Sequence, residues 1–228
     1  MKIDVYSDVV CPWCYIGERR LDAALQQFAG ADRVEVTFRP YQLDPGARDE
    51  AAPLRPYLEQ RYGARAAAML RHVSSAAAAE GITMDWDAAL SGNTRTAHRL
   101  LRLAQVEYGA DTQRALAGRL FSLHFTRGGD ILDAAQLVEE AVAAGLDRAR
   151  VEAYLASDEG AAELADEFER ARTLGITAVP TFVFNGKYLV QGAQPAAALL
   201  EVLERVAAED APSASDEADG CVDGACTA

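Results

Sequence analysis

Residues 7–17 read S-D-V-V-C-P-W-C-Y-I-G and place two cysteines, Cys11 and Cys14, three positions apart. The run Ile3–Ser7 before them alternates apolar and polar residues and predicts a short buried strand. The apolar spacing after them predicts a helix, and Pro12 suits its first turn because the missing N–H would be unpaired there. The dithiol therefore stands where a strand passes into a helix.

The position of this pair suits thiol–disulfide exchange, in which the thiolate is the reactive form. At a helix start, Cys11 faces unpaired backbone N–H groups and the positive end of the helix dipole, and both favour the thiolate. Cys14 lies on the same helix face and can close a small disulfide ring with Cys11. The pair thus supplies an attacking thiol and a resolving thiol. The alternative is a pair that is only buried or that binds a metal ion.

Strand signals occur near both ends of the chain. Val34–Phe38 predicts a second strand, which a right-handed crossover would place parallel to the first. Thr181–Phe184 and Lys187–Val190 flank the dipeptide Asn185-Gly186 and predict a hairpin. A last helix is expected to begin at Pro195.

The residues between these strands show helical spacing. Helices are expected over 55–79, 94–108, 112–125, 133–144 and 148–174, the last broken near Ser157. We therefore expect an α/β protein in which residues 1–50 and 175–208 form one discontinuous domain and residues 51–174 form an all-helical insertion.

The composition limits the partners of the chain. Its 228 residues include 22 Lys or Arg and 35 Asp or Glu, which give a formal net charge of −13 at pH 7. Such a surface repels phosphate backbones and argues against nucleic-acid binding. No apolar run reaches the roughly 18–20 residues that a membrane span needs, and none of signal-peptide length follows Met1. The sequence therefore favours a cytoplasmic protein that binds neither nucleic acid nor membranes.

With these elements in place, the sequence resembles the thioredoxin fold in its DsbA-family form, βαβ…ββα with a large helical insertion. The opening S-D-V-V-C-P-W-C-Y-I-G, the central N-T-R-T-A-H-R at 93–99 and the closing G-I-T-A-V-P-T-F-V-F-N-G at 175–186 are similar to the FrnE-like branch of that family. This branch is related to the 2-hydroxychromene-2-carboxylate isomerases and the kappa-class glutathione transferases. The similarity covers about residues 1–207.

The resemblance implies thiol–disulfide oxidoreductase activity, with Cys11 and Cys14 as the catalytic pair. It also implies a cis peptide bond between Val179 and Pro180, which would turn the N–H and C=O of Val179 toward an extended substrate chain. The isomerase and transferase relatives typically carry serine where Cys11 stands, so the two thiols favour redox chemistry. Trp13 stands where the periplasmic oxidants have histidine, and without that positive charge we expect a less oxidising couple.

The resemblance also implies a substrate site that includes Asn93 and His98. Asn93 stands at the start of a predicted helix, and His98 lies on the edge of its apolar stripe, from which it can reach a cleft beside the dithiol. A histidine satisfied between helices is the alternative. Trp13 is expected either to offer substrates an apolar surface or to pack under the insertion. The remaining histidines are predicted to be structural, His124 on a face with Leu116 and Leu120, and His72 on a face with Met69.

Residues 209–228 form an acidic tail with six acidic and no basic residues, and this composition predicts flexibility. Cys221 and Cys226 stand in it at a spacing that can close a small disulfide loop. A flexible tail of this length has a root-mean-square reach of roughly 25 Å. We therefore expect an accessory redox pair that exchanges electrons with Cys11–Cys14, the alternatives being an idle dithiol or an adventitious metal chelator. A four-cysteine zinc site is disfavoured because the two pairs lie at opposite ends of the chain.

The sequence predicts a cytoplasmic thiol–disulfide oxidoreductase that acts on protein or small-thiol disulfides as a monomer or weak homodimer. No metal or resident cofactor is expected. An external thiol or disulfide such as glutathione, or a partner dithiol, would exchange electrons with the protein. Two other classes stay open, a glutathione-dependent isomerase or transferase and a thiol-based metal-binding stress protein. The direction of exchange is also open.

Overall fold

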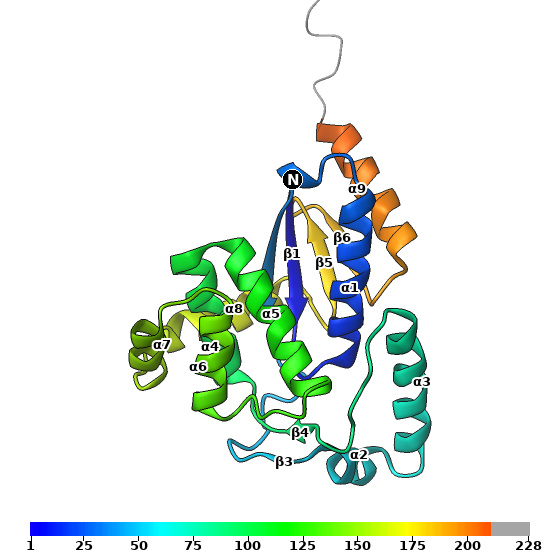
Figure 1. Ribbon diagram of the computed structural model, residues 1–228. Coiled ribbons are helices and arrows are strands. Elements are labelled where there is room, and N and C mark those ends of the chain that lie inside the picture. The colour runs from blue at the N-terminus through cyan, green and yellow to red at the C-terminus, as the bar shows by residue number, and fades with distance from the viewer. Residues whose placement is uncertain (211–228) are drawn as a thin grey trace, which may run out of the picture.

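The computed structural model describes residues 1–210, which fold around a four-stranded sheet of order β2-β1-β5-β6 (Figure 1). Its strands are β1 (Lys2–Ser7), β2 (Glu35–Pro40), β5 (Thr181–Phe184) and β6 (Tyr188–Gln191). β1 runs parallel to β2 and antiparallel to β5, and β5 is antiparallel to β6. Segments from both ends of the chain therefore meet in the centre of one sheet.

Helices flank the sheet and fill most of the chain between β2 and β5 (Figure 1). They are α1 (Pro12–Gln27), α2 (Leu54–Tyr62), α3 (Arg65–Ala79), α4 (Arg95–Leu103), α5 (Ala110–Phe125), α6 (Ala134–Ala143), α7 (Arg148–Leu155), α8 (Ala161–Thr173) and α9 (Ala196–Asp210). A 3-10 turn, η1 (Ala31–Arg33), precedes β2, and a π-helical turn, η2 (Ala104–Tyr108), joins α4 to α5. This is the predicted α/β fold with a helical insertion, and the expected break near Ser157 separates α7 from α8.

The two faces of the sheet are buried by different helices. Ile3 and Val5 of β1 belong to a large core that also contains buried side chains of α1, α5 and α9. Tyr6 points to the other face and packs with Ala171 of α8. Side chains of a strand alternate between its faces, so the pattern of β1 places the sheet between two helical layers.

Two features between β2 and β5 differ from the prediction. The helix expected over 55–79 is broken at Gly63, whose φ of +58° ends α2. A small antiparallel sheet pairs β3 (Ala52–Pro53) with β4 (Leu90–Ser91), where the sequence predicts no strand. Strands of two residues are too short to show an alternating pattern, so periodicity could not reveal them.

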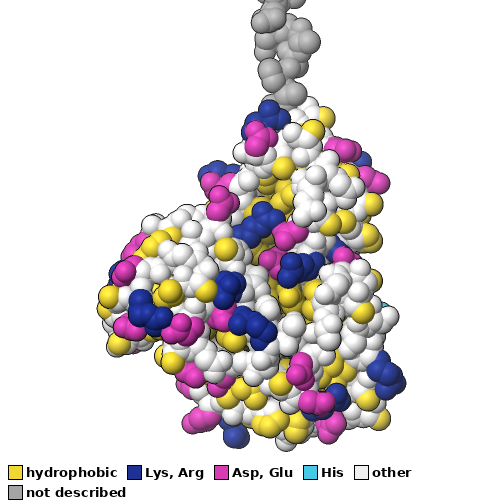
Figure 2. Space-filling view, in the orientation of Figure 1, with side chains coloured by type: hydrophobic (Ala, Val, Ile, Leu, Met, Phe, Trp, Pro, Cys, Tyr) yellow, Lys and Arg dark blue, Asp and Glu magenta, His cyan; other side chains and the backbone are white. Residues whose placement is uncertain are grey.

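The surface of the described residues is mixed in charge. Figure 2 shows acidic and basic side chains close together over the visible face, with hydrophobic patches between them. Among residues 1–210, no helix combines the length and the apolar character needed to cross a membrane.

Candidate active site

Cys11 lies at the N-terminus of α1, as the sequence predicts. It is the N-cap residue, Pro12 opens the helix, and the Cys11 carbonyl accepts a hydrogen bond from the N–H of Cys14 at 3.0 Å. No side chain caps the helix, so its remaining backbone N–H groups are open to a negative charge beside them. Both cysteines are free thiols. The Cys11 thiol therefore stands at an uncapped helix start.

The loop before β5 meets this helix start from the far end of the chain. The Val179–Pro180 bond is cis, as the resemblance implies. The Cys11 thiol donates to the carbonyl oxygen of Val179, with Sγ and O 3.7 Å apart. On α1, Gly17 leaves room for Pro180, because a Cβ at Gly17 would lie 2.9 Å from the Pro180 Cγ. The Val179 backbone thus lies directly beside the Cys11 sulfur.

Cys14 sits behind Cys11 and is fully enclosed, with 2% of its surface exposed. Burial, a hydrogen bond with the Cys11 sulfur and the charge of Cys11 raise the pKa of Cys14 well above its ordinary value. The Ser7 hydroxyl and the backbone N–H of Asp8 also hydrogen-bond the Cys14 sulfur and oppose this rise. Cys14 is therefore the thiol that keeps its proton, and Cys11 is the one suited to attack.

Access to the dithiol is narrow. Cys11 itself is 3% exposed, whereas Pro12, Trp13 and Val179 around it are half-buried. The Trp13 ring lies 5.5 Å from the ring of His72 on α3, centroid to centroid. Trp13 thus contacts the insertion and is also partly open to solvent. A substrate disulfide would approach Cys11 past these half-buried groups.

His72 lies on an exposed face of α3. It shares this face with Met69, as their spacing of three residues predicts, and both side chains are exposed. The His72 ring contacts that of Trp13, and a structural role for His72 stays a prediction. His124 is buried in α5, as predicted, and neither of its ring nitrogens has a hydrogen-bond partner within the described residues. Burial lowers the pKa of His124 to about 4, so this ring is neutral at pH 7.

Asn93 lies just before α4 and is hydrogen-bonded within the protein. Its side-chain N–H donates to the carbonyl of Ala47 at 3.1 Å, and its oxygen accepts from the side chain of Gln42 at 2.9 Å. The same oxygen accepts from the N–H of Arg95 at 3.0 Å. Asn93 therefore ties the segment after β2 to the start of α4, and a direct role in substrate binding stays a prediction.

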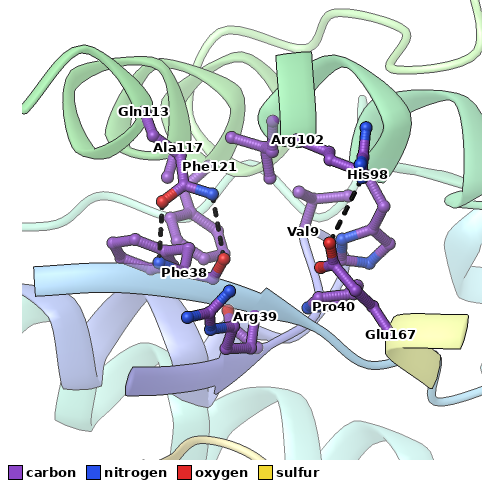
Figure 3. Close-up of a pocket in the computed structure, with 12 residues that line it drawn as sticks. Val9, Phe38, Arg39, Pro40, His98, Arg102, Gln113, Ala117, Phe121 and Glu167 are labelled. Carbon is purple, nitrogen blue, oxygen red and sulfur yellow. Dashed lines mark hydrogen bonds and ion pairs between the residues drawn. The ribbon is translucent and has the colours of Figure 1, made fainter. Parts of the chain in front are cut away.

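His98 reaches the dithiol region through Asp8. Its Nε2 lies 3.1 Å from the Asp8 Oδ1, and both side chains are buried, with 3% and 1% exposure. Figure 3 shows the ring beside Val9, close to the ion pair of Arg102 with Glu167. The cavity that these residues line has a volume of about 10 Å³, which is room for about one water molecule.

Three polar residues of the site are absent from the sequence-based prediction. Ser7 and Asp8 contact the Cys14 sulfur, and their place within S-D-V-V-C at the end of a buried strand is the signal that could have found them. Glu18 lies one turn after Cys14 and is buried against Gly118 of α5, where a Cβ would come 2.8 Å from its Oε1. Burial, and to a lesser degree the charge of Asp22, raise the pKa of Glu18 to about 7.

Metal binding is not supported by any cluster in the described part of the chain. Residues 1–210 contain no group of three or more His, Cys, Asp or Glu side chains that could hold a metal ion. Cys221 and Cys226 lie outside the described residues, so a role for them stays a prediction.

A family model described as a DSBA-like thioredoxin domain matches residues 2–204. Along its whole length, the chain is similar to a probable DsbA oxidoreductase from Streptomyces coelicolor, of known crystal structure. The two sequences are 35% identical, and the match covers 100% of this chain and 99% of the other. The structures superimpose with a TM-score of 0.85.

Two further similar proteins match this chain at lower identity or over a shorter segment. The cytosolic disulfide reductase DsbM from Pseudomonas aeruginosa is 22% identical, with a TM-score of 0.63 over 90% of this chain and 100% of that one, and it shows the fold alone. The uncharacterized protein YwbO of Bacillus subtilis (strain 168) is 37% identical over 54 residues. That match spans about a quarter of each protein, 24% of this chain and 25% of YwbO.

Proposed function

Since the chain belongs to the DSBA-like thioredoxin domain family, we propose that it catalyses thiol–disulfide exchange through Cys11 and Cys14. The observation that carries this proposal is the arrangement of the two thiols, with Cys11 at an uncapped helix start and Cys14 enclosed behind it. A Cys11 that is nucleophilic and a Cys14 that keeps its proton have the complementary properties that a two-step exchange requires.

In the reducing direction, the Cys11 thiolate attacks one sulfur of a substrate disulfide. A Cys11–substrate disulfide forms, and the other substrate sulfur leaves as a thiolate. Cys14 then gives its proton to the released substrate thiolate or to solvent and attacks the Cys11 sulfur, which forms the Cys11–Cys14 disulfide and releases the second substrate thiolate. Two electrons pass to the substrate. Glutathione or a partner dithiol restores the reduced protein, so no resident cofactor is needed.

The substrates that fit this site are disulfides of proteins or of small thiols. The Val179 carbonyl beside the Cys11 sulfur and the half-buried Trp13 offer a backbone partner and an apolar surface to an extended chain. The similar disulfide reductase of P. aeruginosa is described as cytosolic, and a cytoplasmic site of action is part of the proposal. A monomer or a weak homodimer is sufficient for this chemistry, because one chain carries both thiols.

The proposal is tested by insulin reduction with the full chain and glutathione. We expect purified protein to accelerate insulin reduction. A glutathione-conjugation assay with an aromatic electrophile and the metal content of the same preparation test the alternative classes. Conjugation without insulin reduction would favour the isomerase or transferase class. Stoichiometric metal without insulin reduction would favour a metal-binding protein.

We further propose that Cys221 and Cys226 exchange electrons with the catalytic pair. A Cys11–Cys14 disulfide would accept two electrons from the tail dithiol, so that the tail pair becomes the disulfide. Replacing Cys221 and Cys226 together by serine is expected to slow insulin turnover but to leave the reaction of Cys11 with iodoacetamide unchanged, since the helix start acts locally. In monomeric Cys14→Ser protein, mass spectrometry should find a disulfide between Cys11 and a tail cysteine. Absence of that bond would contradict the relay.

A further inference from the structure

The turn between β1 and α1 holds both members of the dithiol through the backbone of one residue, Asp8. The carbonyl of Asp8 accepts a hydrogen bond from the N–H of Cys11 at 2.9 Å. The N–H of Asp8 hydrogen-bonds the Cys14 sulfur, as does the hydroxyl of Ser7. The position of the Asp8 backbone therefore affects where Cys11 lies and how well a charge on Cys14 is stabilised.

The side chain of Asp8 is fixed by two segments distant in sequence. Its Oδ2 accepts a hydrogen bond from the N–H of Leu43 at 2.8 Å, and its Oδ1 lies 3.1 Å from the Nε2 of His98. The His98 ring is itself held edge-on to Phe168 of α8, with ring centroids 5.8 Å apart. A buried carboxylate needs such partners, because an unpaired one would be costly. The insertion thus supplies, through α4, one of the two partners that fix Asp8.

We propose that Asp8 and His98 form a positioning pair that holds the Asp8 backbone against the dithiol and promotes the resolving step. This inference rests on the proposed exchange function. Before Cys14 attacks the Cys11–substrate disulfide it must lose its proton, and negative charge then develops on the Cys14 sulfur. The hydrogen bonds of the Ser7 hydroxyl and the Asp8 N–H act to lower the pKa of Cys14, and a hydrogen bond to a charged atom is stronger than one to a neutral thiol. Neither His98 nor Asp8 transfers a proton or touches the substrate in this scheme.

The pair predicts a kinetic separation between the two steps of exchange. Cys11 attacks while Cys14 is still protonated, so the first step depends on Asp8 only through the position of Cys11, not through a charge on Cys14. The second step depends directly on the groups around Cys14. Loss of one hydrogen bond to a charged group corresponds to about a tenfold change in rate. A loss of His98 is therefore expected to slow resolution far more than it slows formation of the mixed disulfide.

The test compares His98→Leu with His98→Gln in the full chain, with glutathione disulfide as the probe. Rapid mixing and mass spectrometry give the rates at which the Cys11–glutathione disulfide forms and is resolved. We expect His98→Leu to resolve it about tenfold more slowly than the parent, with a much smaller effect on the rate of formation. The glutamine amide can take the place of Nε2, so His98→Gln should recover most of the lost rate.

Leu100→Ala is the matched control, because Leu100 is fully buried in the same helix and its loss leaves a cavity. This variant should lower the urea midpoint while both rates stay near the parent values. Resolution at the parent rate in folded His98→Leu would overturn the positioning role, as would equal slowing of resolution in Leu100→Ala. If His98→Leu does not fold, Asp8→Asn tests the same pair, and it too should slow resolution selectively. A parent protein that forms no mixed disulfide would instead contradict the proposed function.

Discussion

A Cys11→Ser variant is expected to lose all measurable insulin reduction. Serine offers no thiolate to the substrate disulfide, so the first sulfur–sulfur bond cannot form. The fold should persist, because Cys11 caps α1 through its backbone and no side-chain cap is lost. Insulin turnover with glutathione measures the effect, and urea unfolding of the same sample shows whether the variant is folded.

Cys14→Ser should differ from Cys11→Ser in the product that accumulates. The attack by Cys11 still proceeds, but no resolving thiol follows, so a substrate remains bound through a Cys11 disulfide. Non-reducing electrophoresis and peptide mass spectrometry detect this adduct, which Cys11→Ser should not form. Insulin turnover by Cys14→Ser at the parent rate would show that the two roles are assigned wrongly.

Much of this site could be predicted from local sequence. A strand followed by C-P-W-C and an amphipathic helix places Cys11 at the helix start, because the apolar spacing and Pro12 both act within a few residues. The hairpin around Asn185-Gly186 is equally local, since Asn185 adopts a positive φ of 49° that few residues other than glycine and asparagine accept.

The groups that complete the site come from distant segments and could not be found in this way. Val179 and Cys11 are 168 residues apart, and only the family resemblance brought them together before the structure. His98 and Asp8 are 90 residues apart, and nothing in the local sequence around either residue indicates that the two side chains meet. The burial of Glu18 likewise depends on Gly118 of another helix. Helical spacing predicts the face on which such a residue lies, but not what covers that face.

Two buried titratable groups near the site are expected to act on stability in opposite directions. The pKa of Glu18 is raised from 4.5 to about 7, chiefly by burial. The folded protein therefore keeps a proton that the unfolded chain has released, and stability falls as pH rises from about 4.5 to 7. The pKa of His124 is lowered from 6.5 to about 4, also by burial. Here the unfolded chain binds the extra proton, so stability falls as pH drops from about 6.5 to 4.

Each shift corresponds to about 3 kcal/mol in the free energy of unfolding. Between about pH 4.5 and 6.5 the two contributions have opposite slopes and nearly cancel. The stability of the parent protein therefore shows neither contribution clearly, and single substitutions are needed to separate the two. Relative to the parent, Glu18→Gln should raise the free energy of unfolding by up to about 3 kcal/mol at pH 8 and by little at pH 4.5. His124→Leu should raise the free energy of unfolding most at the acidic end of the range, because the variant lacks the buried ring that must stay unprotonated in the folded protein.

Urea unfolding between pH 4.5 and 8.5 measures these differences as variant minus parent, which removes the titration of the other carboxylates. Glu201→Gln, on the exposed side of α9, controls for the loss of one surface charge. The decisive quantity is the slope of each difference with pH, since altered packing alone shifts stability by the same amount at every pH. A Glu18→Gln difference that rises from pH 4.5 to 7 and then levels off would place the titration at the buried carboxyl. A difference independent of pH would show that folding does not shift the pKa of this carboxyl.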